Sequence, residues 1–340
     1  MIIASSQLVA NPLVSVVIAT YNQLQFIEET VMSALNQVCD FPFEVIVADD
    51  GSNDGQRDFL KTLQEKYPSQ LRLIFNDVNL RVTKNYVNAI HQARGKYVAT
   101  LDGDDIWIAK EKLQKQVEVL EKNEEVSIVY TGYERFDMNT NRVSQVINEW
   151  DTPCLRVKGK ESAAVFVNNN YAYPLGSSAC FRRDIYIKGC LDYPELIAKD
   201  SAGEGTILNI AMSMNGLFFF LNNPMVRYRV LAQSVSHFDT AAETLDFEFR
   251  CMDLLMKPAR ILNISPAILV QNLSKKNYKF SILNGEMNEY HRLMKKAYDN
   301  YKYPEMEKAY KLYCNPLSLL AGKALSFCFQ LAKNIKQSFK

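Results

Sequence analysis

The sequence has few histidines, no closely spaced pair of cysteines and almost no net charge. Three histidines among 340 residues, with no H-E-x-x-H motif, argue against a histidine-built zinc site. The formal net charge of +1 gives the chain no overall field for nucleic acid, so we expect no nucleic-acid partner. The seven cysteines are scattered and form no C-x-x-C pair, which favours a reducing, cytoplasmic environment.

Glycine is missing where several nucleotide-binding families need it. Residues 12–22 contain none, so both the G-x-G-x-x-G of dehydrogenases and a glycine-rich phosphate loop of sugar nucleotidyltransferases are absent. Residues 1–12 lack the basic and long apolar segments of a secretory signal. With 48% hydrophobic residues over 340 positions, we expect a globular chain with one large domain and a smaller addition.

Strand and helix patterns alternate through the first hundred residues. Short runs rich in β-branched residues predict buried strands, and apolar residues spaced by three and four predict helices between them. The expected strands are 14–19, 43–48, 71–75 and 96–101, and the expected helices are 26–35, 56–67 and 83–93. This alternation favours an α/β domain with a mostly parallel central sheet, whose ligands bind beyond the carboxyl ends of the strands.

Two carboxylates, Asp49 and Asp50, follow the second predicted strand. Carboxylates at that edge of a sheet can accept hydrogen bonds from a base N–H or a ribose hydroxyl. The alternative is turn chemistry, in which Ser52 or Asp54 caps the next helix.

Three more carboxylates, Asp102, Asp104 and Asp105, follow the fourth predicted strand. They lie within four residues and repel one another unless a cation or a donor-rich ligand sits among them. Because Mg²⁺ and similar ions prefer a few carboxylates plus phosphate oxygens, the cluster predicts a metal shared with a diphosphate. A solvated acidic turn is the alternative.

These motifs lie in the order and spacing found in one family. They are 14–22 (VSVVIATYN), 44–55 (EVIVADDGSNDG), Gly95-Lys96-Tyr97, 101–105 (LDGDD), Lys112-Leu113 with Gln116, 176–183 (GSSACFRR), and Tyr228-Arg229 with 234–236 (SVS). The sequence therefore resembles the family 2 inverting glycosyltransferases of the GT-A fold, of the type that builds bacterial surface polysaccharides. The resemblance covers about residues 13–237. It implies a GT-A catalytic domain at 1–238, with a donor-binding half at about 13–108 and an acceptor half at about 109–238.

The resemblance also implies the reaction. A hexosyl or N-acetylhexosaminyl group would pass from a nucleotide-sugar donor, by family habit a UDP-sugar, to a hydroxyl of a glycan acceptor. A lipid-linked saccharide of surface-polysaccharide or O-antigen synthesis is the acceptor we expect. By similarity, Thr20 and Tyr21 lie beside the nucleotide, Asp50 reads the base, and Asp102 faces ribose. Asp104 would ligate the cofactor, Mn²⁺ or Mg²⁺.

Further candidates complete the expected donor site. Arg229 and His237 are cations that could meet the diphosphate, with ordinary ion pairing as the alternative. The whole expected set is Thr20, Tyr21, Asn22, Asp49, Asp50, Asp102, Gly103, Arg229 and His237.

The catalytic base lies where the chain departs from the family. An inverting displacement needs a carboxylate to deprotonate the acceptor hydroxyl. The family's usual Glu-Asp pair falls on Glu204 and Gly205, so the expected aspartate is missing. Glu204 is our first candidate for the base and Asp200 the second. Loss of the aspartate leaves one alternative, a non-catalytic subunit that binds a sugar nucleotide or a glycan.

Beyond residue 238 the pattern predicts helices, ending in a tail at 316–340. Leucines and phenylalanines alternate there with four lysines and no acidic residue, which is typical of an amphipathic helix. We expect either an anionic membrane surface, at the inner face of the plasma membrane, or the protein's own core as its partner.

Overall fold

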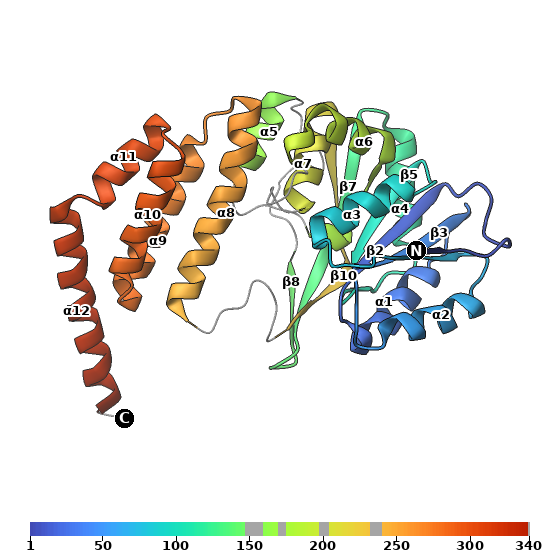
Figure 1. Cartoon of the computed structure of the whole chain (residues 1–340), viewed down its shortest axis with the longest axis horizontal. Coiled ribbons are helices and arrows are strands. Elements are labelled where there is room, and N and C mark those ends of the chain that lie inside the picture. Colours follow the sequence, from blue (N-terminus) through green and yellow to red (C-terminus); the bar gives the residue numbers. More distant parts are fainter. Residues whose placement is uncertain (147–158, 169–174, 197–203, 232–239, 339–340) are drawn as a thin grey trace. The chain divides into compact units, whose positions relative to one another are not determined.

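The computed structural model describes residues 1–146, 159–168, 175–196, 204–231 and 240–338, and the structural statements below concern these residues. The chain divides into two compact units (Figure 1). Unit 1 holds residues 1–166 and 172–232, and unit 2 holds residues 167–171 and 233–340.

Unit 1 is built on a ten-stranded mixed sheet with the strand order β1-β4-β3-β2-β5-β9-β7-β10-β6, and β8 pairs with β7. The strands are β1 (Ile2–Ile3), β2 (Val14–Thr20), β3 (Phe43–Asp49), β4 (Leu71–Phe75), β5 (Tyr97–Asp102), β6 (Ile106–Trp107), β7 (Val126–Asp137), β8 (Arg142–Val146), β9 (Cys180–Arg182) and β10 (Leu217–Val230). Strands β4, β3, β2 and β5 run parallel, as do β7 and β10.

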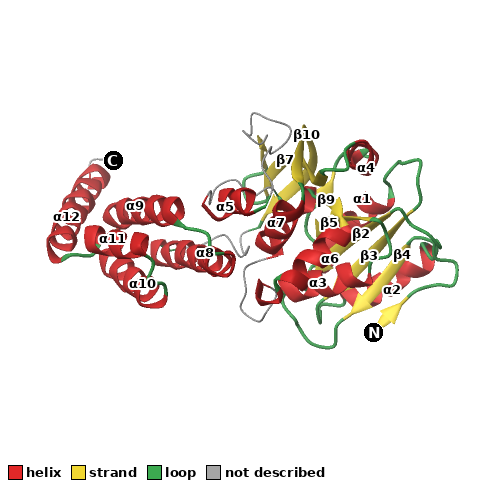
Figure 2. Cartoon of the chain, turned by 90° about the horizontal axis from the view of Figure 1, so that it is seen from above, coloured by secondary structure: helices red, strands yellow, loops and turns green. Residues whose placement is uncertain are grey.

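Helices cover both faces of this sheet (Figure 2). They are α1 (Leu24–Leu35), α2 (Gln56–Lys66), α3 (Val82–Gln92), α4 (Lys112–Lys122), α5 (Lys160–Asn168), α6 (Arg183–Asp192) and α7 (Glu204–Asn215). The apolar faces of α1, α2 and α4 share one core with β2, β3 and β4, whereas α3, α6 and α7 lie on the opposite face. The central strands are buried on both sides, which explains their continuous apolar runs.

Unit 2 is helical, with α8 (Ala241–Leu262), α9 (Ala267–Asn284), α10 (Met287–Asn300), α11 (Pro304–Tyr313) and α12 (Pro316–Ser338). Thr240 begins α8 with a capping box that it shares with Glu243. Tyr290 is fully buried between Phe249 and Tyr278, and its ring meets each of theirs edge to face. Among the described residues, no helix is apolar and long enough to cross a membrane.

The α/β fold with a helical C-terminal region is confirmed, with one refinement. The four predicted strands and three predicted helices of the first hundred residues are present, within two residues at each boundary. The sheet as a whole is mixed rather than mostly parallel, because β1, β6 and β8 pair antiparallel and so does the short strand β9, which lies between β5 and β7. Its three residues give too short a pattern for the sequence to indicate direction.

Candidate functional site

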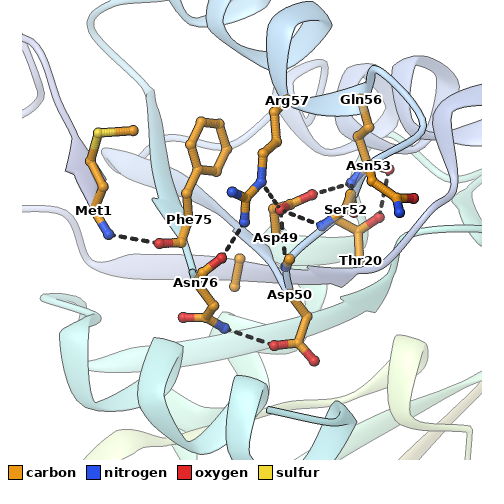
Figure 3. Close-up of polar contacts among 12 residues, drawn as sticks. Met1, Thr20, Asp49, Asp50, Ser52, Asn53, Gln56, Arg57, Phe75 and Asn76 are labelled. Carbon is orange, nitrogen blue, oxygen red and sulfur yellow. Dashed lines mark hydrogen bonds and ion pairs between the residues drawn. The ribbon is translucent and has the colours of Figure 1, made fainter. Parts of the chain in front are cut away.

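The loop after β3 is organised around Asp49. Its carboxylate is fully buried and accepts hydrogen bonds from the backbone N–H groups of Gly51 and Ser52 at 3.3 and 3.1 Å (Figure 3). Arg57 forms an ion pair with the same carboxylate, and the Gln56 amide donates to its second oxygen at 2.6 Å. With all of its surface used inside the fold, Asp49 shapes the turn and presents no free face to a ligand.

Asp50, the next residue, is held at the carboxyl edge of the sheet. One carboxylate oxygen accepts hydrogen bonds from the Asn76 amide at 2.9 Å and the Leu80 N–H at 2.8 Å. Figure 3 shows the other oxygen pointing away from the Asn76 amide. The side chain is therefore fixed in direction, and the residue is buried, with 3% of its surface exposed.

The end of the central strand β2 lies between the two acidic loops. The Thr20 hydroxyl is within hydrogen-bond distance of the side-chain oxygens of Gln23 (2.9 Å) and Gln56 (3.0 Å), so it helps to join these segments. Tyr21 follows with 46% of its surface exposed. Asn22 has a φ of +53° and exchanges hydrogen bonds with the loop after β3, donating to the Ser52 hydroxyl at 2.9 Å.

Ser177 connects two of the three carboxylates after β5. Its hydroxyl lies 3.0 Å from an Asp102 oxygen and 2.5 Å from an Asp105 oxygen, while Tyr86 donates to Asp102 at 2.7 Å. Burial raises the pKa of Asp102, and burial together with the charges of Asp102 and Asp104 raises the pKa of Asp105 well above its usual range. Since the Ser177 hydroxyl has a single proton, a neutral Asp105 can donate to it while it donates to Asp102.

Asp104, like Asp102, is partly exposed, whereas Asp105 is buried. Burial raises the pKa of Asp104 to about 6, and the charge of Asp102 adds to the rise, against smaller opposing effects of Arg229 and Gln23. This surplus of negative charge fits a divalent cation. The described residues contain no group of three or more histidine, cysteine, aspartate or glutamate side chains arranged to hold a metal by themselves. A cation here would therefore need oxygen ligands from a bound molecule, such as a diphosphate.

Gly103 sits where no side chain fits. A Cβ atom would lie 2.7 Å from Thr20 and 2.3 Å from the Gln23 side-chain oxygen. The Thr30 hydroxyl of α1 lies 3.0 Å from the Gly103 carbonyl oxygen and 2.8 Å from that of Asp105. The acidic loop is therefore packed directly on α1 and on the end of β2.

Arg229 supports the same loop from β10. Its guanidinium donates to the Asp104 carbonyl at 2.8 Å, pairs with Glu29, and lies over the Phe26 ring at 5.1 Å. Its backbone N–H donates to Asp105 at 3.1 Å. Only 5% of the residue is exposed, so Arg229 has little surface for a diphosphate and instead fixes the position of the Asp104 backbone.

Three sequence candidates fall partly or wholly outside the described residues. Asp200 and His237 are outside them, and Glu204 is the first residue of α7, with an undescribed side chain.

Sequence reasoning missed the roles of Ser177 and Tyr86 as hydrogen-bond donors to Asp102. For Ser177, the available signal was its place in the motif at residues 176–183 (GSSACFRR).

Comparisons with known proteins identify the family of this chain. Residues 15–189 match the model of the glycosyl transferase family 2. The Escherichia coli UDP-Glc:alpha-D-GlcNAc-diphosphoundecaprenol beta-1,3-glucosyltransferase WfgD is 34% identical over 128 residues, which are 38% of this chain and 48% of that protein. The matches to the curated relatives span about a third to a half of those proteins' lengths.

Two solved structures have a similar fold. S. aureus TarS 1-349 in complex with UDP-GlcNAc superposes with a TM-score of 0.60 at 17% identity, covering 94% of this chain and 92% of that one. The mannosyltransferase PcManGT of Pyrobaculum calidifontis, in complex with GDP-Man and Mn²⁺, gives a TM-score of 0.51 at 17% identity, covering 96% and 87%.

Proposed function

Because the chain belongs to glycosyl transferase family 2, we propose that it transfers a sugar from a nucleoside diphosphate donor to an acceptor hydroxyl, with inversion at the anomeric carbon. One observation carries the proposal. Asp50, Tyr21 and Asp104 follow the adjacent parallel strands β3, β2 and β5, so they share one carboxyl edge. Ligands of such sheets bind at that edge.

The donor nucleotide would lie along this edge. The second oxygen of Asp50 can accept a base N–H, Tyr21 offers an exposed ring, and Asp102 can accept a ribose hydroxyl. UDP is our first choice of nucleotide and a hexosyl or N-acetylhexosaminyl group our choice of sugar. TarS was solved with UDP-GlcNAc and WfgD is named for UDP-Glc, which supports this choice, while PcManGT was solved with GDP-Man.

Asp104 would hold Mn²⁺ or Mg²⁺ together with the donor diphosphate. Its pKa of about 6 means that, near neutral pH, the carboxylate is charged at an energetic cost that a cation relieves. When bound, the ion would neutralise charge that builds on the leaving diphosphate. Arg229 and Ser177 contribute by fixing the loop that presents Asp104, through the Asp104 carbonyl and through Asp105.

The base would remove the proton from the acceptor hydroxyl. Glu204 is our first choice, because it aligns with the glutamate of the family's pair and begins α7, and Asp200 is our second. Glu204→Gln should lower turnover by roughly 10²-fold while donor binding persists, and Asp200→Asn should lower it less. Normal turnover of Glu204→Gln beside a defective Asp200→Asn would exchange the two roles.

The acceptor we propose is a lipid-linked saccharide used in surface-polysaccharide synthesis, with the reaction on the cytoplasmic side of the membrane. The name of WfgD, which specifies a sugar on diphosphoundecaprenol, supports this choice of acceptor.

A screen of UDP- and GDP-sugars, read by release of nucleoside diphosphate, tests the proposal on the purified full chain. We expect release that requires Mn²⁺ or Mg²⁺ and stops on addition of EDTA. Asp58→Asn, which removes an exposed carboxylate on α2, is the matched control for changes at Asp104. Donor binding by calorimetry without release or transfer would indicate the non-catalytic subunit, and absence of binding by every donor would refute the proposal.

A further inference from the structure

Helix α12 packs on unit 2 through its small and polar residues. A Cβ at Gly322 would lie 2.6 Å from the Met287 side chain, so α12 and α10 are in close contact there. Ser326 is buried in the same seam, and the Gln330 amide donates to the Leu283 carbonyl of α9 at 2.9 Å. Asn315 caps the helix by accepting the Ser318 N–H at 2.9 Å. Figure 1 shows α12 beside α9 and α10.

Most of the large apolar residues in the described part of α12 face outward instead. Leu317, Leu320 and Phe327 are 78%, 67% and 70% exposed, and Leu325 is 50% exposed. A helix that used its own protein core as partner would bury its leucines and phenylalanines and expose its serines. The arrangement in α12 is the reverse, so packing on unit 2 does not account for its apolar residues.

The charge of this segment indicates what covers the apolar face. Residues 316–340 contain four lysines and no acidic residue, although the whole chain has a net charge of only +1. Lys323 is exposed in the middle of the apolar run, which is unsuited to a spanning helix and suited to one that lies in the headgroup region. Basic residues beside an apolar face attract anionic lipid headgroups, each by roughly a factor of five in affinity.

From these observations we propose that the outer face of α12, namely Leu317, Leu320, Leu325 and Phe327 with Lys323, docks on an anionic lipid bilayer. This inference is independent of the proposed transferase activity, because it rests on unit 2 alone. It holds whether or not the chain turns over a nucleotide sugar.

Flotation of the full-length protein with vesicles tests the proposal. We expect it to float with vesicles containing about 30% phosphatidylglycerol, to float several-fold less with pure phosphatidylcholine, and to be released as salt rises toward 0.5 M. The double variant Leu320→Ser/Phe327→Ser should lose at least about tenfold in vesicle affinity, because it removes two of the exposed side chains from the inserted face.

Controls separate docking from folding, from self-association and from catalysis. Leu191→Ser, at an apolar side chain of α6 that is 71% exposed, should float like wild type. The thermal unfolding and the nucleotide release of the Leu320→Ser/Phe327→Ser variant should match wild type. If full-length protein stays at the bottom of the gradient at low salt, or if the double variant floats as well as wild type, the proposal is wrong. It is also wrong if light scattering finds that this face instead joins two copies of the chain.

Discussion

The stability of unit 1 should depend on pH through Lys112. This lysine, on α4, is fully buried. Its side-chain nitrogen donates a hydrogen bond to the Gln116 side-chain oxygen at 2.7 Å and lies 4.1 Å from the centre of the Trp107 ring. Burial lowers the pKa of Lys112 from 10.5 to about 7, and nearby Cys180 slightly opposes this. The folded protein therefore holds the amine largely neutral in weakly alkaline solution.

The direction of the effect follows from proton binding. Because the folded pKa lies below the unfolded value, the unfolded chain binds the extra proton between them, and stability falls as pH drops from 10.5 toward 7. The shift corresponds to a destabilisation of the folded state by about 5 kcal/mol at pH 6.5 and by about 1 to 2 kcal/mol at pH 9.5. Wild type should thus gain about 3 kcal/mol of unfolding free energy over this interval from Lys112.

Lys112→Met should remove that gain. Methionine fills a similar volume without a charge, at the cost of an unpaired Gln116 oxygen, about 1–3 kcal/mol. The variant should be more stable than wild type at pH 6.5 and should lose this advantage by pH 9.5. Urea unfolding followed by circular dichroism at both pH values measures the difference. Lys115→Met, on the exposed side of α4, is the control. An equal pH dependence in Lys112→Met and wild type would refute the reasoning.

Other changes at the site have separable outcomes. Asp104→Asn should lower turnover by about 10²-fold or more with the fold intact, and EDTA-insensitive, wild-type-like activity would contradict the metal assignment. Asp50→Ala should weaken donor affinity by about 10- to 100-fold in calorimetry, since it removes a charged acceptor, and unchanged affinity would leave Asp50 as turn structure. Ser177→Ala should cost about 1–3 kcal/mol of unfolding free energy in urea, because Asp102 and Asp105 lose a shared partner. Gly103→Ala should lower stability and activity, because its Cβ would meet Thr20 at 2.7 Å. Wild-type values of both would show that this tight packing is not required.

Much of unit 1 could be predicted from the sequence because its signals are local. The apolar runs of β2 and β3 and the acidic residues that follow them depend on neighbours along the chain. Strand direction at β9 and the partners of Ser177 depend on residues 50 or more positions away, which no local pattern contains.

Burial explains why the role of a single carboxylate was harder to predict than the motif. Asp49 and Asp50 are adjacent, chemically identical and both buried, yet one pairs with Arg57 and the other accepts hydrogen bonds from Asn76 and Leu80. The role of Arg229 was hard to predict for the same reason. The sequence shows only that a cation is present, whereas in the structure its guanidinium donates to the backbone of the acidic loop at Asp104. The sequence specifies charge, whereas the partners of that charge are set by packing.

In both acidic loops, after β3 and after β5, the carboxylates have two different roles. In each loop, one carboxylate is bonded to other parts of the fold. Asp49 forms an ion pair with Arg57, and Asp105 forms hydrogen bonds with the Ser177 hydroxyl and the Arg229 backbone N–H. In each, a second carboxylate follows at the same edge of the sheet: Asp50, which is buried and bonded to Asn76 and Leu80, after β3, and Asp104, which is partly exposed, after β5. A buried, hydrogen-bonded carboxylate holds its loop in one conformation, so the neighbouring carboxylate is positioned before any ligand arrives. Burial, together with repulsion from Asp102, raises the pKa of Asp104, and this is the energetic cost of the arrangement that a cation bound there with the donor would offset.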